Sequence, residues 1–526
     1  MKIIKRVKNP KNKESIEERQ KPQPQSEDRV NLDLSKSLEE NYEKFQAFLK
    51  ESTDAVFRKF KLGKNKIQCA LVYIDGLTDK SVIHDSILKP MMTSVLEYEA
   101  LVEDEIKLEE AFDFIMDQVL SVADMRESET IDEAMLFVMS GEVALMVDGH
   151  DKLIIISARG WSTRGISDPQ SESVIRGARE GFTETLRTNT ALLRRKCKDP
   201  NMVIRTIRLG RRSKTDVSYV FIKGITNTRL IEELEERLNA VDIDQVASAG
   251  HLEQLIQDNS FTPLPQMQVT ERPDKAISNL MEGRIIVLVD NSPFALTIPT
   301  TFAQFFQSPE DYNERWIVAS FIRFIRWAAS FFAVFTPAVY IAVVTYHPGL
   351  IPTRLALSIS ATRAGVPFPS IIEAVLMELT IELLRESGAR LPKGIGQTIG
   401  IVGGLVIGDA AVNAGLTSPI MVIIVALTAI ASFVIPTYSA AIGLRTMRFP
   451  LMIMAAILGL YGVMLAFIFI NIHLVSIKSF GMDFMTPQAP TIFSDMKDFV
   501  IRGPANKMRK RPVQSYPIDM IRMDME

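Results

Sequence analysis

Three carboxylates interrupt an otherwise apolar stretch, residues 370–384, where they could attract a cation. They are Glu373, Glu378 and Glu382. At the centre of a membrane helix each charge costs about 2.5–3.5 kcal/mol, so three charges facing lipid would cost on the order of 8–10 kcal/mol. We therefore expect this helix to face protein or water, to protonate its acids, or to lie at an interface. Two interpretations stay open: a structural interfacial helix, and a vestibule that selects cations with carboxylates.

Spacing separates the three acids. Residues four apart share a helix face, so Glu378 and Glu382 point together, whereas Glu373 points elsewhere. Glu382 also lies three residues before Arg385, a spacing at which the two side chains can pair.

A stripe of small residues follows between Ile395 and Asn413, in a segment apolar enough to lie in a bilayer. Glycines four residues apart advance about 40° around an ideal helix, so neighbouring helices can approach closely and cross at an angle. Ionisable groups at membrane depth normally face protein or water. The segment is either a tightly packed structural helix or a helix that lines a polar path in an oligomer. The candidate residues of that path are Gly396, Gly400, Gly404, Gly408, Asp409 and Asn413.

Other chemistry finds little support in the sequence. The two cysteines, Cys69 and Cys197, suggest neither a disulfide framework nor a metal site. We find no phosphate-binding loop and no arrangement typical of acid–base or nucleophilic catalysis, so we expect no enzyme, no metal and no cofactor. A net charge of −3 gives no basic footprint for nucleic acid.

The composition changes along the chain, from polar up to about residue 307 to apolar between residues 327 and 477. The basic N-terminus precedes no apolar segment, so we do not expect a signal peptide, and the polar part should stay in the cytosol. The predicted fold class is an α/β cytosolic N-terminal domain with two subdomains, followed by an all-α polytopic membrane domain. The predicted divisions are a disordered tail (1–37), two α/β subdomains (38–168 and 169–307), an interfacial linker helix (308–326), a transmembrane domain (327–477) and a C-terminal tail (478–526).

Hydrophobic periodicity predicts the elements of the first subdomain. Two helices are expected, from Leu38 to Lys59 and from Leu108 to Met125. A short β-rich run, Ile67 to Ile74, predicts a strand. The hairpin signal Asp148-Gly149 predicts further strands from Glu142 to Val147 and from Leu153 to Ser157.

The second subdomain is predicted in the same way. A charged helix from Ser171 to Arg187 should open it. An amphipathic helix from Thr228 to Ala240 should bury Leu230, Ile231, Leu234 and Leu238. The expected strands are Met202 to Leu209, Val217 to Ile225 and Ile285 to Val289.

The apolar part should begin at a membrane surface, because residues 308–325 alternate aromatic side chains with arginines, a pattern typical of an interfacial anchor. The expected spans are Trp327 to Tyr346, the glycine segment, Pro419 to Ile435 and about Leu451 to His473. Prolines break the region from His347 to Phe368. The basic loops at 385–393 and 445–448 and the basic tail all favour the cytosol, and no simple span count satisfies all three. We expect about four full spans plus a partial one, with a cytosolic tail.

Short motifs resemble those of a known family. The run Thr270-Glu271-Arg272-Pro273-Asp274 and the run Gly408-Asp409-Ala410-Ala411 are similar to motifs in the A subunits of GerA-type spore germination receptors. The resemblance extends from about residue 40 to residue 515. One departure is Gly177-Ala178, where the family would have Gly-Pro, and it concerns only a local turn. Further matching runs lie at 177–184, 188–189, 193–195, 265–266, 280–284, 290–293, 310–312 and 396–400.

This resemblance implies a subunit of a nutrient-sensing receptor in the spore inner membrane. Its partners would be a transporter-like B subunit that binds the germinant, a lipoprotein C subunit, further copies of the chain and membrane lipid. Residues 270–274 would have a structural or signalling role. Family members are thought to form the ion-conducting part, so we expect a germinant-gated ion channel. A non-conducting scaffold subunit and a transporter-like protein are the alternatives.

Overall fold

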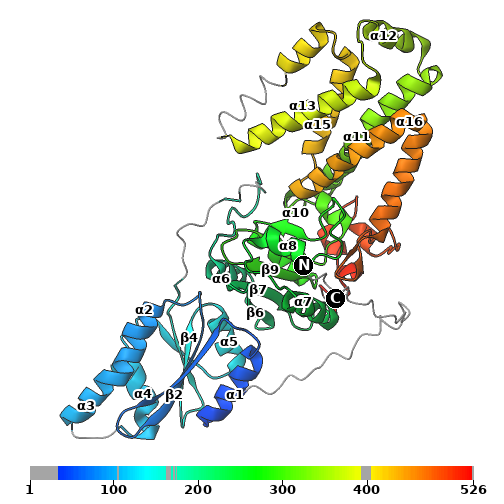
Figure 1. Ribbon diagram of the computed structural model, residues 1–526. Coiled ribbons are helices and arrows are strands. Elements are labelled where there is room, and N and C mark those ends of the chain that lie inside the picture. The colour runs from blue at the N-terminus through cyan, green and yellow to red at the C-terminus, as the bar shows by residue number, and fades with distance from the viewer. Residues whose placement is uncertain are drawn as a thin grey trace.

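The computed structural model describes residues 33–102, 106–160, 168–169, 172, 174–391, 404 and 406–523. Two α/β units follow one another along the chain, and a tall helical bundle stands on the second of them (Figure 1). The chain leaves the second unit for the bundle and returns to that unit near its C-terminal end (Figure 1). The predicted order, α/β followed by helical, is confirmed.

The first unit is built on an antiparallel sheet with strand order β1-β2-β4-β5-β3. Successive side chains of a strand point to opposite faces, and here both faces are buried. Cys69 and Leu71 enter one core, whereas Ala70 and Val72 enter the other. The strands are β1 (Ala55–Leu62), β2 (Ile67–Ile74), β3 (Met125–Ser128), β4 (Val143–Val147) and β5 (Leu153–Ile156).

Helices cover both faces of this first sheet. One face carries α1 (Leu38–Leu49) and α5 (Ile131–Met139). The other face carries two interrupted helical stretches, 80–102 and 108–119. These stretches consist of α2 (Lys80–Val82), η2 (Ile83–Leu88), η3 (Pro90–Ser94) and α3 (Val95–Val102), then η4 (Leu108–Glu110), α4 (Ala111–Phe114) and η5 (Ile115–Val119).

Two helix predictions in this unit are too long. The helix expected to reach Lys59 ends at Leu49, and its second half is β1, which pairs with β2 along its whole length. The helix expected to reach Met125 ends at Val119, since Met125 begins β3. In both cases pairing with a neighbouring strand outweighs a helical periodicity that is weak on its own. The predicted strand Ile67–Ile74 and the hairpin around Asp148-Gly149 are confirmed.

The second unit has an antiparallel sheet with strand order β6-β7-β9-β10-β8. Helices α7 and α8 cover one face, and α6 and α9 cover the other. The elements are α6 (Leu186–Lys196), β6 (Met202–Leu209), β7 (Thr215–Ile222), α7 (Thr228–Asn239), α8 (Ala249–Ile256), β8 (Gln268–Thr270), α9 (Pro273–Met281), β9 (Ile285–Val289) and β10 (Ala295–Ile298).

Most predictions for the second unit are confirmed. Strands β6, β7 and β9 lie where the β-rich runs indicated, and α7 buries Leu230, Leu234 and Leu238, whereas Ile231 is only half-buried. The predicted helix from Ser171 to Arg187 is wrong. The helix begins at Leu186, and the described residues 174–185 are bends and irregular chain.

The two units share one plan. In each unit a helix is followed by a two-stranded hairpin and then by further helices. An edge strand, another helix and a second hairpin complete the unit. The strand order β1-β2-β4-β5-β3 of the first sheet corresponds, position by position, to β6-β7-β9-β10-β8 of the second. The backbone N–H of Leu38 donates to Asp148 Oδ1 at 3.1 Å, and that of Leu186 donates to Asp290 Oδ1 at 3.1 Å. The same bond therefore fixes the first helix to the end of the central strand in both units.

Equivalent side chains repeat this correspondence. The side-chain amide of Asn41 accepts from the backbone N–H of Ser35 and donates to its carbonyl. The side-chain amide of Asn189 makes the same two hydrogen bonds with Thr183, which also lies six positions earlier. Gly141 and Gly283, which are 142 positions apart, both take a positive φ where the chain enters the central strand. The α/β region is an internal duplication.

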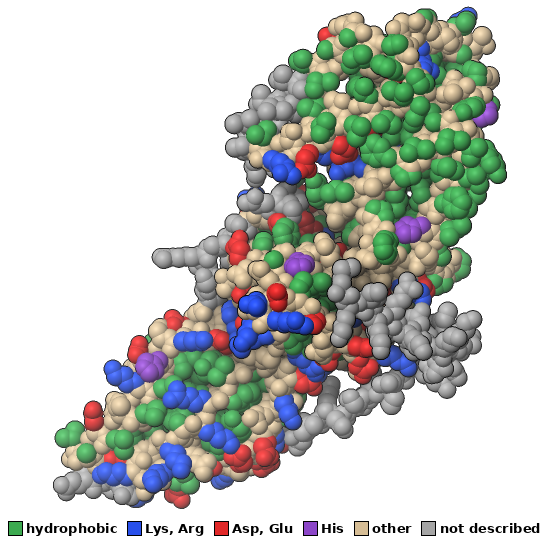
Figure 2. All heavy atoms as spheres, viewed as in Figure 1, with side chains coloured by type: hydrophobic (Ala, Val, Ile, Leu, Met, Phe, Trp, Pro, Cys, Tyr) green, Lys and Arg blue, Asp and Glu red, His purple; other side chains and the backbone are tan. Residues whose placement is uncertain are grey.

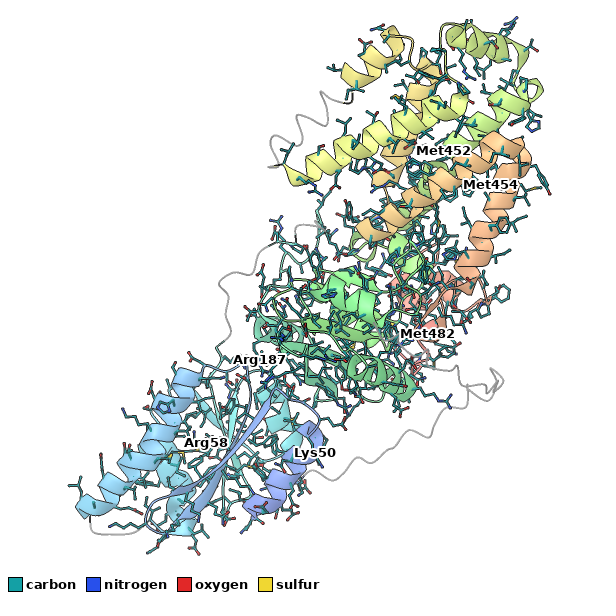
Figure 3. The ribbon with its side chains drawn as sticks, in the orientation of Figure 1. Lys50, Arg58, Arg187, Met452, Met454 and Met482 are labelled. Carbon is teal, nitrogen blue, oxygen red and sulfur yellow. The ribbon has the colours of Figure 1, made fainter. Side chains whose placement is uncertain are left out.

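Polar contacts join the two units. Arg194 of α6 is fully buried and donates to Asp54 of the first unit, with its Nε 2.8 Å from Oδ2 and its Nη2 2.9 Å from Oδ1. Thr53 N donates to the Ile204 carbonyl of the edge strand β6 at 2.8 Å. Arg187, labelled in Figure 3, lies at this joint.

The bundle helices run alternately away from the second unit and back. Helix α11 (Trp316–Tyr346) leaves it, and at the far end the Thr345 hydroxyl lies 2.8 Å from the Ser370 hydroxyl at the start of α13 (Ser370–Arg390). After α15 (Pro419–Phe433), the Thr437 hydroxyl donates to the Phe305 carbonyl of the second unit at 3.2 Å. The turn η7 (Pro348–Leu350) and α12 (Thr353–Arg363) follow the far end of α11.

Helix α16 (Tyr438–Ser476) is a hairpin of two helices. Gly459 interrupts it with φ 63° and ψ −143°. Both ends return to one loop of the second unit, since Gly443 packs against the Pro263 carbonyl and His473 Nε2 lies 2.9 Å from the Thr262 hydroxyl. Figure 1 shows α16 rising and then descending. The single span predicted from Leu451 to His473 is therefore wrong.

The C-terminal segment folds onto the second unit. The backbone N–H of Thr300 donates to the Ser479 hydroxyl at 3.0 Å, and that of Ile518 donates to the Ile225 carbonyl at 2.8 Å. Met482, labelled in Figure 3, lies at this contact. The segment comprises β11 (Lys478–Ser479), β12 (Met482–Asp483), η8 (Asp495–Lys497), η9 (Ala505–Lys507) and η10 (Val513–Ser515).

Among the described residues, two helices are long and apolar enough to cross a membrane, α11 and α16, and α15 is a shorter apolar helix. Hydrophobic side chains cover much of the visible bundle surface, whereas most of the visible charged side chains lie on the α/β units, among polar and hydrophobic ones (Figure 2). The polar and apolar parts of the sequence thus correspond to separate parts of the molecule.

Candidate functional site

Glu373 joins three elements at the far end of the bundle. It lies in the first turn of α13 and is buried. Its Oε1 accepts from Arg363 Nη2 of α12 at 3.0 Å, and its Oε2 accepts from Ser418 N at the start of α15 at 2.9 Å. Both carboxylate oxygens are therefore paired, so this acid faces protein.

Glu378 lies further along α13 and is equally buried. It forms an ion pair with Arg448 Nη1 of α16 and accepts a hydrogen bond from the Thr428 hydroxyl of α15 at 3.1 Å. A charged hydrogen bond of this kind is about twice as strong as a neutral one. Glu378 therefore links α13, α15 and α16 inside the bundle.

Glu382 is the most accessible of the three acids, with about a third of its side chain exposed. Its Oε1 accepts from Arg385 Nη1 at 2.8 Å, so the predicted pair three residues apart is confirmed. Arg445 Nε of α16 lies 3.3 Å from the same oxygen. Arg385 and Arg445 thus share this carboxylate.

These contacts correct the prediction of a basic loop at 445–448, and they show which of the environments expected for the acidic helix applies. Residues 445–448 are not a basic loop; they belong to α16, and Arg445 and Arg448 point into the bundle because the acids of α13 need counter-charges there. The acids form a ladder of ion pairs along α13, not a ring of unpaired carboxylates. The sequence analysis expected this helix to face protein or water, to protonate its acids, or to lie at an interface. Glu373 and Glu378 are buried against protein, as the first of these options requires.

The ladder has more donors than acceptors near its middle. Among the described residues, Arg448 Nε and Nη2 and Arg385 Nε are buried and have no hydrogen-bond partner. A buried unpaired donor costs about 1–3 kcal/mol. A further hydrogen-bond acceptor in this region would therefore stabilise the structure.

The glycine segment is described only in part, and Gly396 and Gly400 lie outside the described residues. Among the described residues, a Cβ added at Gly404 would meet no atom within 4 Å, and one added at Gly408 would meet Val422 of α15 at 3.7 Å. Within this one chain, the described part of the stripe is therefore in contact with α15 on one side and open at Gly404.

Asp409 and Asn413 lie on the outer surface of this segment. Both side chains are exposed, and Asn413 Nδ2 donates to Asp409 Oδ2 at 3.0 Å. Val406 and Ile407, which precede them, are also exposed. An ionisable group therefore lies on an outer, otherwise apolar face of the bundle.

The motif at residues 270–274 holds the connection between the two units. Arg272 is fully buried, and its Nη2 donates to the Ala178 carbonyl and to Asp274 Oδ2, each at 2.8 Å. The Glu271 carbonyl accepts from Phe182 N at 2.7 Å, and the Thr270 hydroxyl bonds Glu172. Pro273 begins α9, where a missing N–H costs nothing. The motif therefore fixes the described part of the connecting segment to the second unit.

Charged contacts also anchor the start of α11. Arg323 Nε lies 2.8 Å from Asp311 Oδ2, and Arg326 Nη1 lies 2.7 Å from Asp311 Oδ1. Asp498 of the C-terminal segment accepts from Arg323 Nη1 at 2.6 Å. Asp311 lies in the short helix α10 (Glu310–Asn313). In the predicted interfacial helix these two arginines thus point into the protein, and the aromatic side chains Phe321 and Phe324 point outward.

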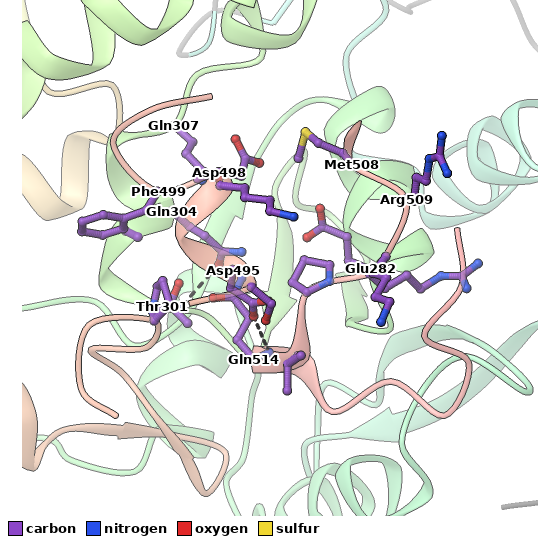
Figure 4. Close-up of a pocket in the computed structure, with 18 of the residues that line it drawn as sticks. Glu282, Thr301, Gln304, Gln307, Asp495, Asp498, Phe499, Met508, Arg509 and Gln514 are labelled. Carbon is purple, nitrogen blue, oxygen red and sulfur yellow. Dashed lines mark hydrogen bonds between the residues drawn. The ribbon is translucent and has the colours of Figure 1, made fainter. Parts of the chain in front are cut away.

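A cavity of about 260 Å³ lies beside this junction, between the second unit and the C-terminal segment. Figure 4 shows Glu282 and Asp495 on its wall, and Asp498 lines it too. Burial raises the pKa of Glu282 and that of Asp495. The Tyr312 hydroxyl donates to Asp498 Oδ2 at 2.8 Å. Acidic and basic side chains thus share the cavity wall, and Asp498 links the cavity to the start of α11. The basic residues that line it are Lys497, Lys507, Arg509, Lys510 and Arg511.

Comparison with known proteins decides the family. A model of the Bacillus/Clostridium GerA spore germination protein family matches residues 43–514. The chain belongs to the GerA family. Spore germination protein B1 of Bacillus subtilis (strain 168) is 41% identical over 93% of this chain and 100% of its own length. Spore germination protein GerLA of Bacillus cereus is 40% identical over 91% of this chain and 96% of its own length.

A solved structure is also similar to this GerA-family chain. It is the crystal structure of the N-terminal domain of the A subunit of the Bacillus megaterium spore germinant receptor GerK3, with 32% sequence identity and a TM-score of 0.41. The similarity covers 51% of this chain and 97% of that chain. The resemblance expected from the motifs is confirmed, and a role in spore germination follows from the family.

Sequence reasoning missed the basic partners of Glu373 and Glu378 in this GerA-family chain. Arg363 was not considered as a partner, and Arg448, 70 positions after Glu378, was assigned to a loop. One signal was available, because several acids in an apolar segment require counter-charges on other helices of the same bundle. That signal predicts that partners exist, but it does not identify them.

Proposed function

We propose that this chain is a membrane subunit of a nutrient germinant receptor and that several copies assemble into a germinant-gated ion channel. The observation that carries the proposal is the exposed pair of Asp409 and Asn413 on an apolar helix. A carboxylate facing lipid there would cost about 2.5–3.5 kcal/mol. A ring of copies removes this cost, because each copy can turn the same face towards a water-filled axis.

The glycines support the same arrangement. Gly404 is open in a single chain, so another helix can approach its backbone closely or ions can pass beside it. We place the glycine segment next to the axis of the ring and the Glu382 end of α13 near a mouth. Glu382 and its two partners, Arg385 and Arg445, would together set the electrostatic field at this mouth.

We place both α/β units and the C-terminal segment in the cytosol. Helix α11 leaves the second unit, and the second half of α16 returns to the same unit, so both ends of the bundle lie on one side. An even number of passes through the membrane follows. Germinant binding belongs to a transporter-like B subunit in this proposal, and a lipoprotein C subunit completes the receptor.

A second candidate function is a non-conducting scaffold that relays germinant binding. The paired state of the α13 acids favours it, since Glu373 and Glu378 have counter-charges within the same chain. On this alternative the glycine stripe serves packing alone.

The experiment compares two glycines at which a side chain meets no neighbour within 4 Å, Gly404 in the glycine segment and Gly349 at the far end of α11. We expect Gly404→Leu to abolish ion release from spores after nutrient addition, because the larger side chain fills the path. Gly349→Leu should release ions normally. Both variants should accumulate in the membrane, which immunoblots of spore membranes measure.

Normal ion release by Gly404→Leu at a normal protein level would contradict the channel. Loss of the Gly404→Leu protein from the membrane, together with loss of release, would favour the scaffold, in which this glycine matters only through assembly.

A further inference from the structure

The loop between α8 and β8 presents a phenylalanine to the outside of the molecule. Phe261 is 96% exposed, more than the other large hydrophobic side chains of the described residues. Burying a side chain of this size is worth about 1.5–3 kcal/mol. An exposed ring of this kind therefore suggests a surface that it contacts.

Hydrogen bonds hold this loop in a defined shape. Phe261 N donates to Asn259 Oδ1 at 2.9 Å, and Asn259 N donates to Gln266 Oε1 at 2.9 Å. Asp258 accepts from Arg237 Nη2 and from Phe480 N, each at 2.7 Å. These bonds thus fix the loop backbone from which the ring projects.

The loop lies at the base of the bundle. The Thr262 hydroxyl, one residue after Phe261, lies 2.9 Å from His473 Nε2 near the end of α16. Leu264 is buried in the apolar core of the bundle. Phe261 is therefore at the level where both halves of α16 meet the second unit.

An apolar surface runs from the bundle down to this level. On the second half of α16, Phe469, Ile472 and Val475 are 62%, 60% and 51% exposed. Residues 460–476 form a helix of about 25 Å, close to the hydrocarbon thickness of about 30 Å. In the proposed membrane arrangement the end of α16 therefore lies at the bilayer surface.

We propose that Phe261 inserts into the boundary between phospholipid headgroups and acyl chains and anchors the second α/β unit to the bilayer. Phenylalanine is among the apolar side chains by which surface-bound segments insert at this boundary. The residues around Phe261 in the loop, Asn259, Ser260 and Thr262, are uncharged, and Lys478, exposed just after α16, is placed to meet lipid phosphates. The inference rests on the proposed membrane arrangement and adds a second contact with lipid, which fixes the height of the second unit below the bundle.

Tryptophan quenching tests the anchor in the full chain, reconstituted in nanodiscs that contain brominated phosphatidylcholine. Trp161, Trp316 and Trp327 are replaced by Phe, and single tryptophans are introduced one at a time. We expect brominated lipid to quench Phe261→Trp and the lipid-facing control Phe469→Trp. It should leave Leu101→Trp unquenched, because Leu101 is 85% exposed on α3 of the first unit, at the end of the molecule far from the bundle (Figure 1).

Quenching of Phe469→Trp without quenching of Phe261→Trp would overturn the anchor and leave the membrane arrangement standing. Quenching of Phe261→Trp alone would support the anchor and contradict the proposed orientation of α16. A Phe261→Trp emission that depends on protein concentration and not on bromine would assign the loop to a contact between copies, which also overturns the anchor. If the tryptophan-free chain does not fold, the added quenching of Phe261→Trp over the native chain decides the same question.

Discussion

Arg194 and Asp54 show how single residues hold the two α/β units together. Both side chains are fully buried at the joint between the two α/β units, and two hydrogen bonds connect them. Arg194 Nη1 also donates to the Met202 carbonyl at 2.6 Å. Removing one partner of such a pair leaves a buried charge without compensation, which costs about 3–5 kcal/mol.

We predict that Arg194→Ala lowers the free energy of unfolding by about 3–5 kcal/mol, measured as a loss of thermal stability in detergent. The matched control is Arg208→Ala on β6, because Arg208 and its partner Asp216 are largely exposed, and such pairs contribute about 0–1 kcal/mol. An Arg194→Ala chain as stable as the control would contradict the assigned role of the pair.

Residue types in the sequence predicted where charge occurs in the bundle but not how it is paired. The pair of Glu382 with Arg385 was predictable, since it depends only on helical spacing. The pair of Glu378 with Arg448 was not, because it requires the packing of α13 against α16. The motif at residues 270–274 was found by resemblance, and its physical role, clamping the connecting segment, required coordinates.

At the scale of elements, the hairpin of α16 determines how the bundle ends. Gly459 adopts a backbone conformation available almost only to glycine, beside Tyr346 and His347 of α11. Three residues later Gly462 packs against the Met454 carbonyl, so the two halves touch through bare backbone. These two glycines allow the chain to return to the second unit.

We predict that Gly462→Ala destabilises the chain, because a Cβ there clashes with the Met454 carbonyl and forces the two halves apart. Overpacking of this kind costs about 1–3 kcal/mol, measurable as a lower midpoint of thermal unfolding in detergent. Gly250→Ala in α8 is the control, since a Cβ there meets no atom within 4 Å. Equal midpoints for the two variants would show that the halves of α16 do not pack as described.

Elements were predictable where the pattern was strong and local. The amphipathic helix α7 and the hairpin of β4 and β5 follow from periodicity and turn residues. The reversal at Gly459 does not, because one apolar run is compatible with one long helix or with two short ones. The internal duplication was not predicted. Matched residues 142 positions apart, such as Asp148 and Asp290, are present in the sequence, but only the structure shows that they occupy equivalent places.

At the scale of the whole molecule, several contacts among the described residues connect the bundle to the second α/β unit. Helix α11 begins beside Asp311, the loop at Thr262 meets α16, and the C-terminal segment packs on the second unit and on α11 through Asp498. A shift of the second unit would therefore reach α11 and α16 together. This arrangement suits a subunit that converts a signal at one end into a change in the bundle.

The measurement that tests the central claim most directly is the mass of the purified chain in mild detergent by native mass spectrometry. The account predicts a closed ring, with a mass that is an integer multiple, greater than two, of the 59.0 kDa chain. In such a ring the face with Asp409 and Asn413 surrounds the axis. A monomer, or a one-to-one complex with a transporter-like partner, would contradict the channel and leave the scaffold as the function of this chain.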